Sequence, residues 1–234
     1  MSSTVDTPTD NGAWSNRGMG EIAAVNVVHE VRPDEHNGAG ETAIDKRPVS
    51  GRTPVRMLGL QGDRQMDVAH HGGRDQALYA YAAEDAAWWA EQLGEPVDPG
   101  RFGENLTTTG LDVTGSLVGE RWRLGGQDGA LLEVTQPRIP CATFQDWMGQ
   151  ARWVRRFTEH GAPGAYLRVL EEGTVAAGDP VEVVHRPTHG ISIGECNAGF
   201  EPSVGRRLIE AADTGELDLA DSLRQYAERA VERT

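Results

Sequence analysis

Short apolar segments rich in β-branched residues, separated by Gly, Pro and polar residues, recur along the chain from about residue 21 to residue 188. Residues 22–31, 131–135 and 181–185 show this composition most clearly, and it is typical of strands. Residues 83–93 instead have apolar side chains at helical spacing, which predicts a surface helix. A count of about eight to ten short strands with few helices among them indicates a mainly β fold, either a barrel or a sandwich.

Both ends of the chain depart from this pattern. The first 20 residues are rich in Ser, Thr, Asp, Asn and Gly, which predicts a flexible tail. Near the other end, residues 201–213 and 217–233 have helical periodicity, and with the short segment 191–198 they predict a small three-helix extension. The predicted organisation is therefore a tail (1–20), a β domain (21–188) and a C-terminal helical extension (189–234).

Charge and composition narrow the classes of partner. The formal net charge is −14 and the isoelectric point is about 4.9, which argues against binding to nucleic acid or to anionic membranes because both need a basic surface. We find no run of about 18 apolar residues and no signal-peptide pattern. Two cysteines in unlike contexts do not suggest a disulfide framework. We therefore expect a cytoplasmic protein, with an oligomeric state that the sequence leaves open.

The most distinctive candidate for chemistry is Cys141, which follows one of the predicted strands. Pro137 and Pro140 stiffen the segment before it, because proline fixes φ and removes a backbone donor. Arg138 places a cation nearby, which would favour the thiolate form that binds metals and attacks electrophiles. The residues alone also allow Cys141 to be a small buried apolar side chain, as many cysteines are. Cys196 lies away from every dense motif, and we interpret it as structural.

Two further segments combine Gly with polar side chains. Gly72 and Gly73 follow a histidine doublet that ends at His71, and paired glycines let a backbone approach a ligand closely. A zinc site there is disfavoured, since adjacent histidines chelate one ion poorly and no second ligand pair has the usual spacing. Glu104 and Asn105 form the other segment, where turn capping is the alternative to a functional role.

Five motifs occur in chain order, namely Leu58-Gly59-Leu60-Gln61-Gly62-Asp63, His71-Gly72-Gly73 with Asp75-Gln76-Ala77, Phe102-Gly103-Glu104-Asn105-Leu106, Gly119-Glu120 and Gln136-Pro137-Arg138-Ile139-Pro140-Cys141. Taken together, these motifs resemble the MOSC domain family, named for the C-terminal domain of molybdenum cofactor sulfurase, and within it the stand-alone YiiM-like branch. The resemblance implies a twisted β-barrel with a few peripheral helices and a small C-terminal three-helix extension. It also implies a molybdopterin-type cofactor whose molybdenum is bound by the cysteine equivalent to Cys141.

The resemblance suggests roles for the other site residues. Soft thiolate suits a metal already held by dithiolene sulfur, so Cys141 is the expected metal ligand. The pterin carries a phosphate, which calls for cations and backbone donors. We expect Asn105 to bind the pterin or a substrate, and Glu104 to orient that ligand or relay protons. The expected cofactor-binding set is His71, Gly72, Gly73, Asn105, Arg138 and Lys46 or Arg47, with Cys141, Glu104 and Asn105 as catalytic candidates.

The family resemblance implies an oxidoreductase that reduces small N-hydroxylated compounds. No Gly-x-Gly-x-x-Gly fingerprint or iron–sulfur cysteine cluster occurs in the sequence, so electrons would come from a separate reductase. No pyridoxal-phosphate domain is recognised, and pyridoxal phosphate is not expected as a cofactor. Two alternatives remain open from the residues, namely a molybdenum cofactor carrier without turnover and a cofactor-free cysteine enzyme that pairs Cys141 with His71.

Overall fold

The structure is a computed structural model that describes residues 19–66, 72–197 and 201–232. The first 18 residues of the predicted tail lie outside the described residues, and so does His71 of the predicted cofactor site. Within the described part, no helix is long and apolar enough to cross a membrane.

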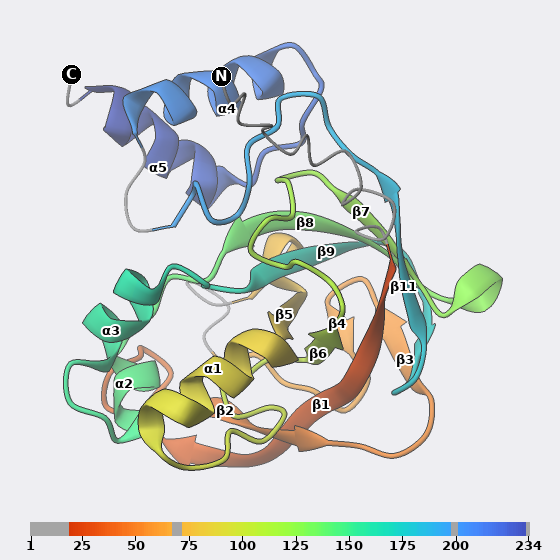
Figure 1. Ribbon diagram of the computed structural model, residues 1–234, viewed down its shortest axis with the longest axis vertical. Coiled ribbons are helices and arrows are strands. Elements are labelled where there is room, and N and C mark those ends of the chain that lie inside the picture. The colour runs from red at the N-terminus through yellow and green to blue at the C-terminus, as the bar shows by residue number, and fades with distance from the viewer. Residues whose placement is uncertain (1–18, 67–71, 198–200, 233–234) are drawn as a thin grey trace, which may run out of the picture.

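The described chain forms a sheet-dominated fold with several helices (Figure 1). The strands are β1 (Met19–Pro33), β2 (Glu41–Pro48), β3 (Thr53–Arg56), β4 (Gly59–Leu60), β5 (Leu78–Ala82), β6 (Leu106–Thr109), β7 (Arg121–Leu124), β8 (Leu131–Pro137), β9 (Ala165–Glu171), β10 (Gly173–Val175) and β11 (Pro180–His185). The α-helices are α1 (Ala83–Leu93), α2 (Ala142–Met148), α3 (Trp153–His160), α4 (Pro202–Asp213) and α5 (Asp221–Glu232), and two short 3₁₀ helices are η1 (Arg74–Gln76) and η2 (Gly126–Asp128).

The main sheet has eight strands in the order β11-β7-β8-β9-β5-β6-β1-β2. An additional pairing joins β11 to β1, so the ladder from β11 to β1 closes on itself and β2 continues outward from β1. A smaller sheet has the order β10-β3-β4. The predicted mainly β fold is thus confirmed as a sheet-dominated fold with helices at its periphery.

Strand β1 connects most of this architecture. It is 15 residues long and pairs in turn with β11, β6 and β2, with register shifts near Val28 and Glu30 that bend it. Ile22 and Val25 are fully buried in the main core cluster, which also contains Trp122 and Leu132. Residues 34–40 connect the end of β1 to β2, and this connection lies at the edge of the pocket described below.

Helices α1, α2 and α3 enclose a second, aromatic cluster on one side of the sheet (Figure 1). Phe144 of α2 is fully buried and meets Trp153 and Phe157 of α3 edge to face, with ring centroids 5.5 Å and 5.1 Å apart. Helix α3 begins only at Trp153, because Gly149 and Arg152 both adopt left-handed backbone conformations.

Helices α4 and α5 pack side by side and cover one end of the sheet (Figure 1). Leu208 and Leu223 of these helices belong to the same buried cluster as Leu132 of the sheet. Residues 191–197 form a β-bridge and turns instead of the third helix expected there, so the described part of the C-terminal extension has two helices.

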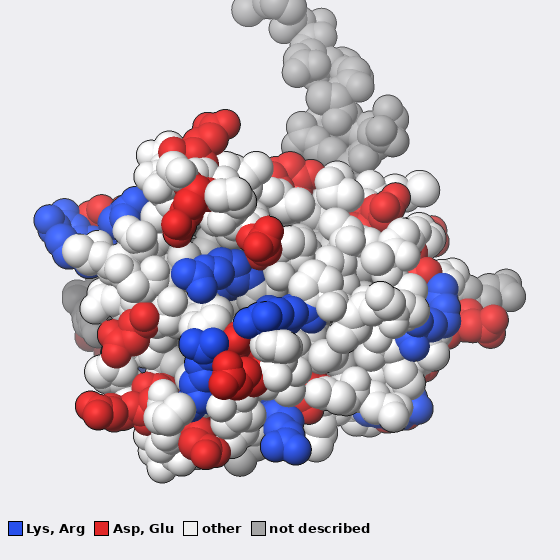
Figure 2. Space-filling view, turned by 90° about the horizontal axis from the view of Figure 1, so that it is seen from below, with Lys and Arg blue, Asp and Glu red and all other residues white. Residues whose placement is uncertain are grey.

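Charged side chains of both signs share the face that carries β1 and β2. Lys and Arg side chains gather near its centre, with Asp and Glu side chains among and around them (Figure 2). Arg32 and Arg47 illustrate this pattern, since each lies 3.2 Å from Asp45. The cations of this face are therefore partly compensated by neighbouring carboxylates.

Candidate functional site

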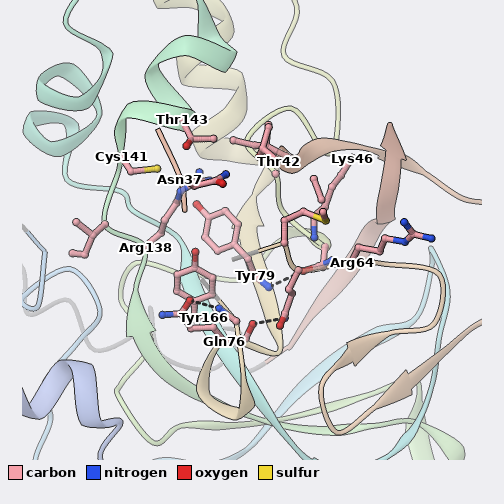
Figure 3. Close-up of a pocket in the computed structure, with 18 residues that line it drawn as sticks. Asn37, Thr42, Lys46, Arg64, Gln76, Tyr79, Arg138, Cys141, Thr143 and Tyr166 are labelled. Carbon is pink, nitrogen blue, oxygen red and sulfur yellow. Dashed lines mark hydrogen bonds between the residues drawn. The ribbon is translucent and has the colours of Figure 1, made fainter. Parts of the chain in front are cut away.

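A pocket opens where β2, β5, β9, the segment after β8 and the start of α2 converge (Figure 3). It brings together side chains that lie more than a hundred residues apart in the sequence. Its lining residues are Asn37, Thr42, Ala43, Ile44, Lys46, Arg64, Gln65, Met66, Gly72, Gln76, Tyr79, Gly103, Asn105, Arg138, Ile139, Cys141, Thr143 and Tyr166.

Cys141 lies at the start of α2, in the N-cap position with extended φ and ψ of −127° and 177°. Strand β8 ends at Pro137, and Pro140 prevents the helix from beginning earlier because it restricts the residue before it and lacks an N–H. The Cys141 side chain is half-buried and belongs to no disulfide. Its sulfur points into the pocket (Figure 3).

Arg138 supplies a buried positive charge beside this thiol. It is only 7% exposed, and one guanidinium nitrogen donates to the carbonyl oxygen of Phe102. The guanidinium carbon lies 3.8 Å from the ring centroid of Phe144 and 5.2 Å from that of Tyr79. Among the described residues, no carboxylate forms an ion pair with it. Burial opposes the charged form, yet interactions with Tyr79, Tyr166 and Cys141 leave the pKa of Arg138 raised.

Lys46 brings a second buried cation to the opposite wall, and this one is paired. Its Nζ lies 2.5 Å from Oδ2 of Asp63, and both side chains are at most 10% exposed. Asp63 also accepts hydrogen bonds from the backbone N–H of Val28 and from Asn105 Nδ2, at 3.0 and 2.7 Å. Burial lowers the pKa of Lys46, and the charge of Asp63 opposes that effect.

Asn105 lines the pocket, and its amide also connects neighbouring strands. Its Oδ1 accepts from the backbone N–H of Tyr79 at 3.1 Å, and its Nδ2 donates to the carbonyl oxygen of Asn26 at 3.3 Å as well as to Asp63. Both ends of the amide are thus engaged with the protein. Asn105 therefore holds Asp63, and through it Lys46, in place.

Glu104 is directed away from the pocket and does not line it. Its carboxylate is 2% exposed and accepts from the backbone N–H groups of Gly100 and Phe102, at 2.6 and 3.0 Å, and from the Thr107 hydroxyl at 2.9 Å. Burial raises the pKa of Glu104, although these hydrogen bonds oppose the rise. This geometry supports the turn-capping interpretation of Glu104.

Of the remaining predicted cofactor-binding residues in the described part of the chain, some line the pocket and others do not. Gly72 lines the pocket, whereas Gly73 does not. Their N–H groups donate within the protein, to Gln76 Oε1 and Gln65 Oε1, both at 3.1 Å. Arg47 lies outside the pocket and pairs with Asp45.

Sequence reasoning missed several lining residues, among them a pair of tyrosines. The rings of Tyr79 in β5 and Tyr166 in β9 lie 5.3 Å apart beside Arg138. Burial raises the pKa of both phenols, and Tyr79 donates its hydroxyl hydrogen bond to the carbonyl oxygen of Pro163 at 2.7 Å. Alternation in strand β5 could have placed Tyr79 on one face, but no local signal showed that this face borders a pocket.

The donor set of the pocket is unusual for a metal site built from protein ligands alone. Among the described residues, no group of three or more His, Cys, Asp or Glu side chains could hold a metal ion. The pocket instead combines the thiol of Cys141 with two buried cations, Arg138 and Lys46, which lie on opposite walls. Such a set suits an anionic ligand that brings most of its own metal donors.

Comparison with known sequences identifies the family of this fold and site. The sequence model of the MOSC domain matches residues 67–182. The uncharacterised protein YflK of Bacillus subtilis (strain 168) is 38% identical over 157 residues, which are 67% of this chain and 70% of YflK. The protein YiiM of Escherichia coli (strain K12) is 32% identical over 179 residues, 73% of this chain and 78% of YiiM.

Two further matches concern a longer protein and a solved structure. A protein of Gibberella moniliformis (strain M3125 / FGSC 7600) named reductase is 33% identical over 149 residues, 62% of this chain but only 26% of that protein. The crystal structure of YiiM from Geobacillus stearothermophilus superimposes with a TM-score of 0.70 at 26% identity, over 91% of this chain and 99% of that one. Together with the match to the domain itself, these likenesses show that the chain belongs to the MOSC domain family, in its stand-alone YiiM-like branch.

Proposed function

We propose that this protein binds a molybdenum cofactor through Cys141 and reduces small N-hydroxylated compounds. One observation carries the proposal, namely that the Cys141 sulfur points into a pocket beside the buried guanidinium of Arg138, for which the described residues supply no carboxylate partner. Membership of the MOSC family supports the cofactor, and the name of the Gibberella relative supports a reductase.

The residues present fit such a cofactor. A buried cation without a carboxylate partner among the described residues is costly, so Arg138 favours a negatively charged occupant. A soft thiolate would be a suitable protein ligand for a metal that already carries dithiolene sulfur. The pocket therefore offers the Cys141 thiolate as a donor for the metal and the Arg138 guanidinium as a charge for the anionic part of the ligand. These two residues are only three positions apart in the sequence.

Each pocket residue then has a defined task. Cys141 ligates the metal, and Arg138 and Lys46 attract the anionic groups of the cofactor. Asn105 keeps the Asp63 carboxylate on Lys46, which fixes the position of that cation. The N–H groups of Gly72 and Gly73 are less suited to anion binding than the sequence suggested, because both donate to glutamine side chains.

When bound, the cofactor would supply two-electron redox chemistry at the metal. Cys141, Tyr79 and Tyr166 line the pocket in which the substrate N–O group would bind. Electrons would come from a separate reductase. For the fold, we infer that the ladder closed by β11 and β1 corresponds to the twisted barrel that the family implies.

Turnover tests this proposal against a cofactor carrier. Protein loaded with the cofactor should oxidise a reduced artificial electron donor only when an N-hydroxylated compound is added, and Cys141→Ala should abolish the reaction. Cys196→Ala is the matched control, because that cysteine is buried outside the pocket. Loaded protein that reduces none of a panel of hydroxylamines would instead indicate a carrier, and undiminished turnover in Cys141→Ala would refute the ligand assignment.

A further inference from the structure

The connection between β1 and β2, residues 34–40, forms part of the pocket wall and is held to α2 by two ties. In the first, the Thr143 hydroxyl donates to Oδ2 of Asp34 at 2.5 Å. In the second, Nε2 of His36 lies 2.6 Å from Oδ2 of Asp146. Both partners on the helix side belong to α2, the helix that begins directly after Cys141.

Besides its hydrogen bond with Thr143, Asp34 accepts hydrogen bonds from within residues 34–40. Its Oδ1 accepts from the backbone N–H of His36 at 2.9 Å, and its Oδ2 also accepts from Asn37 Nδ2 at 2.8 Å. Asn37 and Thr143 both line the pocket, whereas Asp34 does not. Asp34 is 9% exposed and lies behind the two residues that it orients. Cys141, Asn37 and Thr143 are consequently neighbours at one side of the pocket (Figure 3).

Other side chains of α2 are held by aromatic packing and by a further hydrogen bond. Phe144 is fully buried against Trp153 and Phe157, and Trp147 Nε1 donates to the carbonyl oxygen of Arg101 at 2.7 Å. A helix of seven residues has little stability of its own. Its first turn, which bears Thr143, therefore depends on contacts from other elements, and Asp34 makes the hydrogen bond to this turn from residues 34–40.

We infer that Asp34 is a positioning residue for Cys141, which acts by holding the first turn of α2 and Asn37 against the pocket. A carboxylate that accepts three hydrogen bonds from two elements fixes their relative position more firmly than neutral acceptors would. The importance of this positioning for metal ligation rests on the proposed function. The positioning itself does not, because it concerns only contacts within the chain.

The accessibility of the Cys141 thiol tests the inference. The full chain, purified without added cofactor, is treated with iodoacetamide, and the alkylation rates of Cys141 and Cys196 are followed by mass spectrometry. Asp34→Ala should raise the rate at Cys141 by about tenfold, a change that loss of a hydrogen bond to a charged group can produce in a local opening equilibrium. The rate at Cys196, which is 2% exposed, should stay at the wild-type value.

Three further variants separate positioning from general destabilisation. Asp179→Ala removes another buried carboxylate, which binds Arg52 and the backbone N–H of Ala176 outside the pocket. It should lower the melting temperature without changing the alkylation of Cys141. Thr143→Ser keeps the hydroxyl donor and should behave as the wild type, whereas Thr143→Val should raise the rate as Asp34→Ala does.

Several outcomes would overturn the inference. Alkylation of Cys141 in Asp34→Ala within twofold of wild type would do so, and so would an equal increase in Asp179→Ala. If Asp34→Ala does not fold, the comparison of Thr143→Val with Thr143→Ser decides, since equal rates in these two variants would remove the role of the tie. Absence of molybdenum from the wild-type protein would contradict the proposed function alone and would leave these rates unaffected.

Discussion

At the scale of single residues, the pocket treats its two buried cations differently. Lys46 is paired with Asp63, whereas Arg138 is packed between aromatic rings without a carboxylate partner in the described part of the chain. A paired cation costs less to bury but has less charge left for a ligand. Arg138 is therefore the stronger candidate for attracting an anionic cofactor, and the flat guanidinium suits the space between the rings.

Replacing Arg138 tests this distinction. Arg138→Lys keeps the charge but loses the planar group that stacks on Phe144, so we expect the molybdenum and pterin content per chain to fall markedly. Arg47→Lys is the matched control, because Arg47 is exposed and pairs with Asp45 outside the pocket. A normal cofactor content in Arg138→Lys, or an equal loss in Arg47→Lys, would contradict this assignment.

His36 provides a prediction about pH. The hydrogen bond that His36 donates to Asp146 raises the pKa of His36 above 6.5, with smaller contributions from the charges of Asp146, Asp34 and Glu35. The ion pair is therefore complete below about pH 6.5 and is lost as the pH rises through the raised pKa. An NMR titration of the His36 ring should show this elevated pKa, and Asp146→Asn should bring it back toward 6.5. A wild-type value at or below 6.5 would show that the second tie does not form in solution.

At the scale of elements, the pattern of apolar residues predicted those helices and strands whose own residues show a clear periodicity or composition. The helix expected at residues 83–93 is α1 with those bounds, and residues 22–31 and 131–135 lie within β1 and β8. Helix α2 was missed, because seven residues after two prolines have no helical signal of their own. It exists through the burial of Phe144 in the aromatic cluster, which depends on α3 and on Phe102.

The same reasoning explains how much of the site the sequence predicted. Of the candidate site residues, Cys141, Arg138, Lys46, Asn105 and Gly72 line the pocket. The lining tyrosines and Asn37 were not predicted, since they reach the pocket through pairings of distant strands that no local pattern encodes. Sequence motifs also could not show which way a side chain points. Glu104 belongs to a motif but is directed into its own turn, and Arg47 is adjacent to Lys46 but lies on the other face of β2.

The turn that contains Gly100 packs closely against the backbone of Lys46 in β2. Gly100 has a φ of 86°, and a Cβ atom there would collide with the carbonyl oxygen of Lys46. We expect Gly100→Ala to lower the free energy of unfolding by about 2–4 kcal/mol, from backbone strain plus overpacking. Gly94 has a φ of 70° but open space around it, so Gly94→Ala should cost only about 1 kcal/mol. Urea denaturation compares the two variants, and equal losses would show that Gly100 does not constrain Lys46.

At the scale of the whole molecule, the C-terminal helices and the link between them contact segments that build the pocket. Asp218, in the link between α4 and α5, pairs with Arg168 of β9 and lies 2.5 Å from Arg74, next to the loop that carries Gly72. Ser222 of α5 donates to the Gln136 side chain at 2.5 Å, at the end of the strand that leads to Arg138. The helical extension therefore contacts two of the segments that build the pocket.

Arg168 lies at the centre of the contacts between the helical extension and the sheet. Replacing it measures how much these contacts contribute to the free energy of unfolding. It is 1% exposed and lies near Asp75, Glu133 and Asp218. Arg168→Leu leaves the buried Glu133 carboxylate with less compensation, so the free energy of unfolding should fall by about 3 kcal/mol. Arg155→Leu removes only an exposed pair with Glu159 and should change it by less than about 1 kcal/mol. Comparable losses in urea denaturation would contradict the importance of the buried cluster.

The central claim is that Cys141 holds a molybdenum cofactor in this pocket, and cofactor content tests it most directly. The wild-type protein, Cys141→Ala and Cys196→Ala are expressed in a host that makes the cofactor, and molybdenum and pterin are measured per chain. We predict near-stoichiometric cofactor in the wild type and in Cys196→Ala, with molybdenum lost from Cys141→Ala. A wild-type protein without metal or pterin, from a host shown to load another molybdoenzyme, would contradict the account, and so would a full complement of molybdenum in Cys141→Ala.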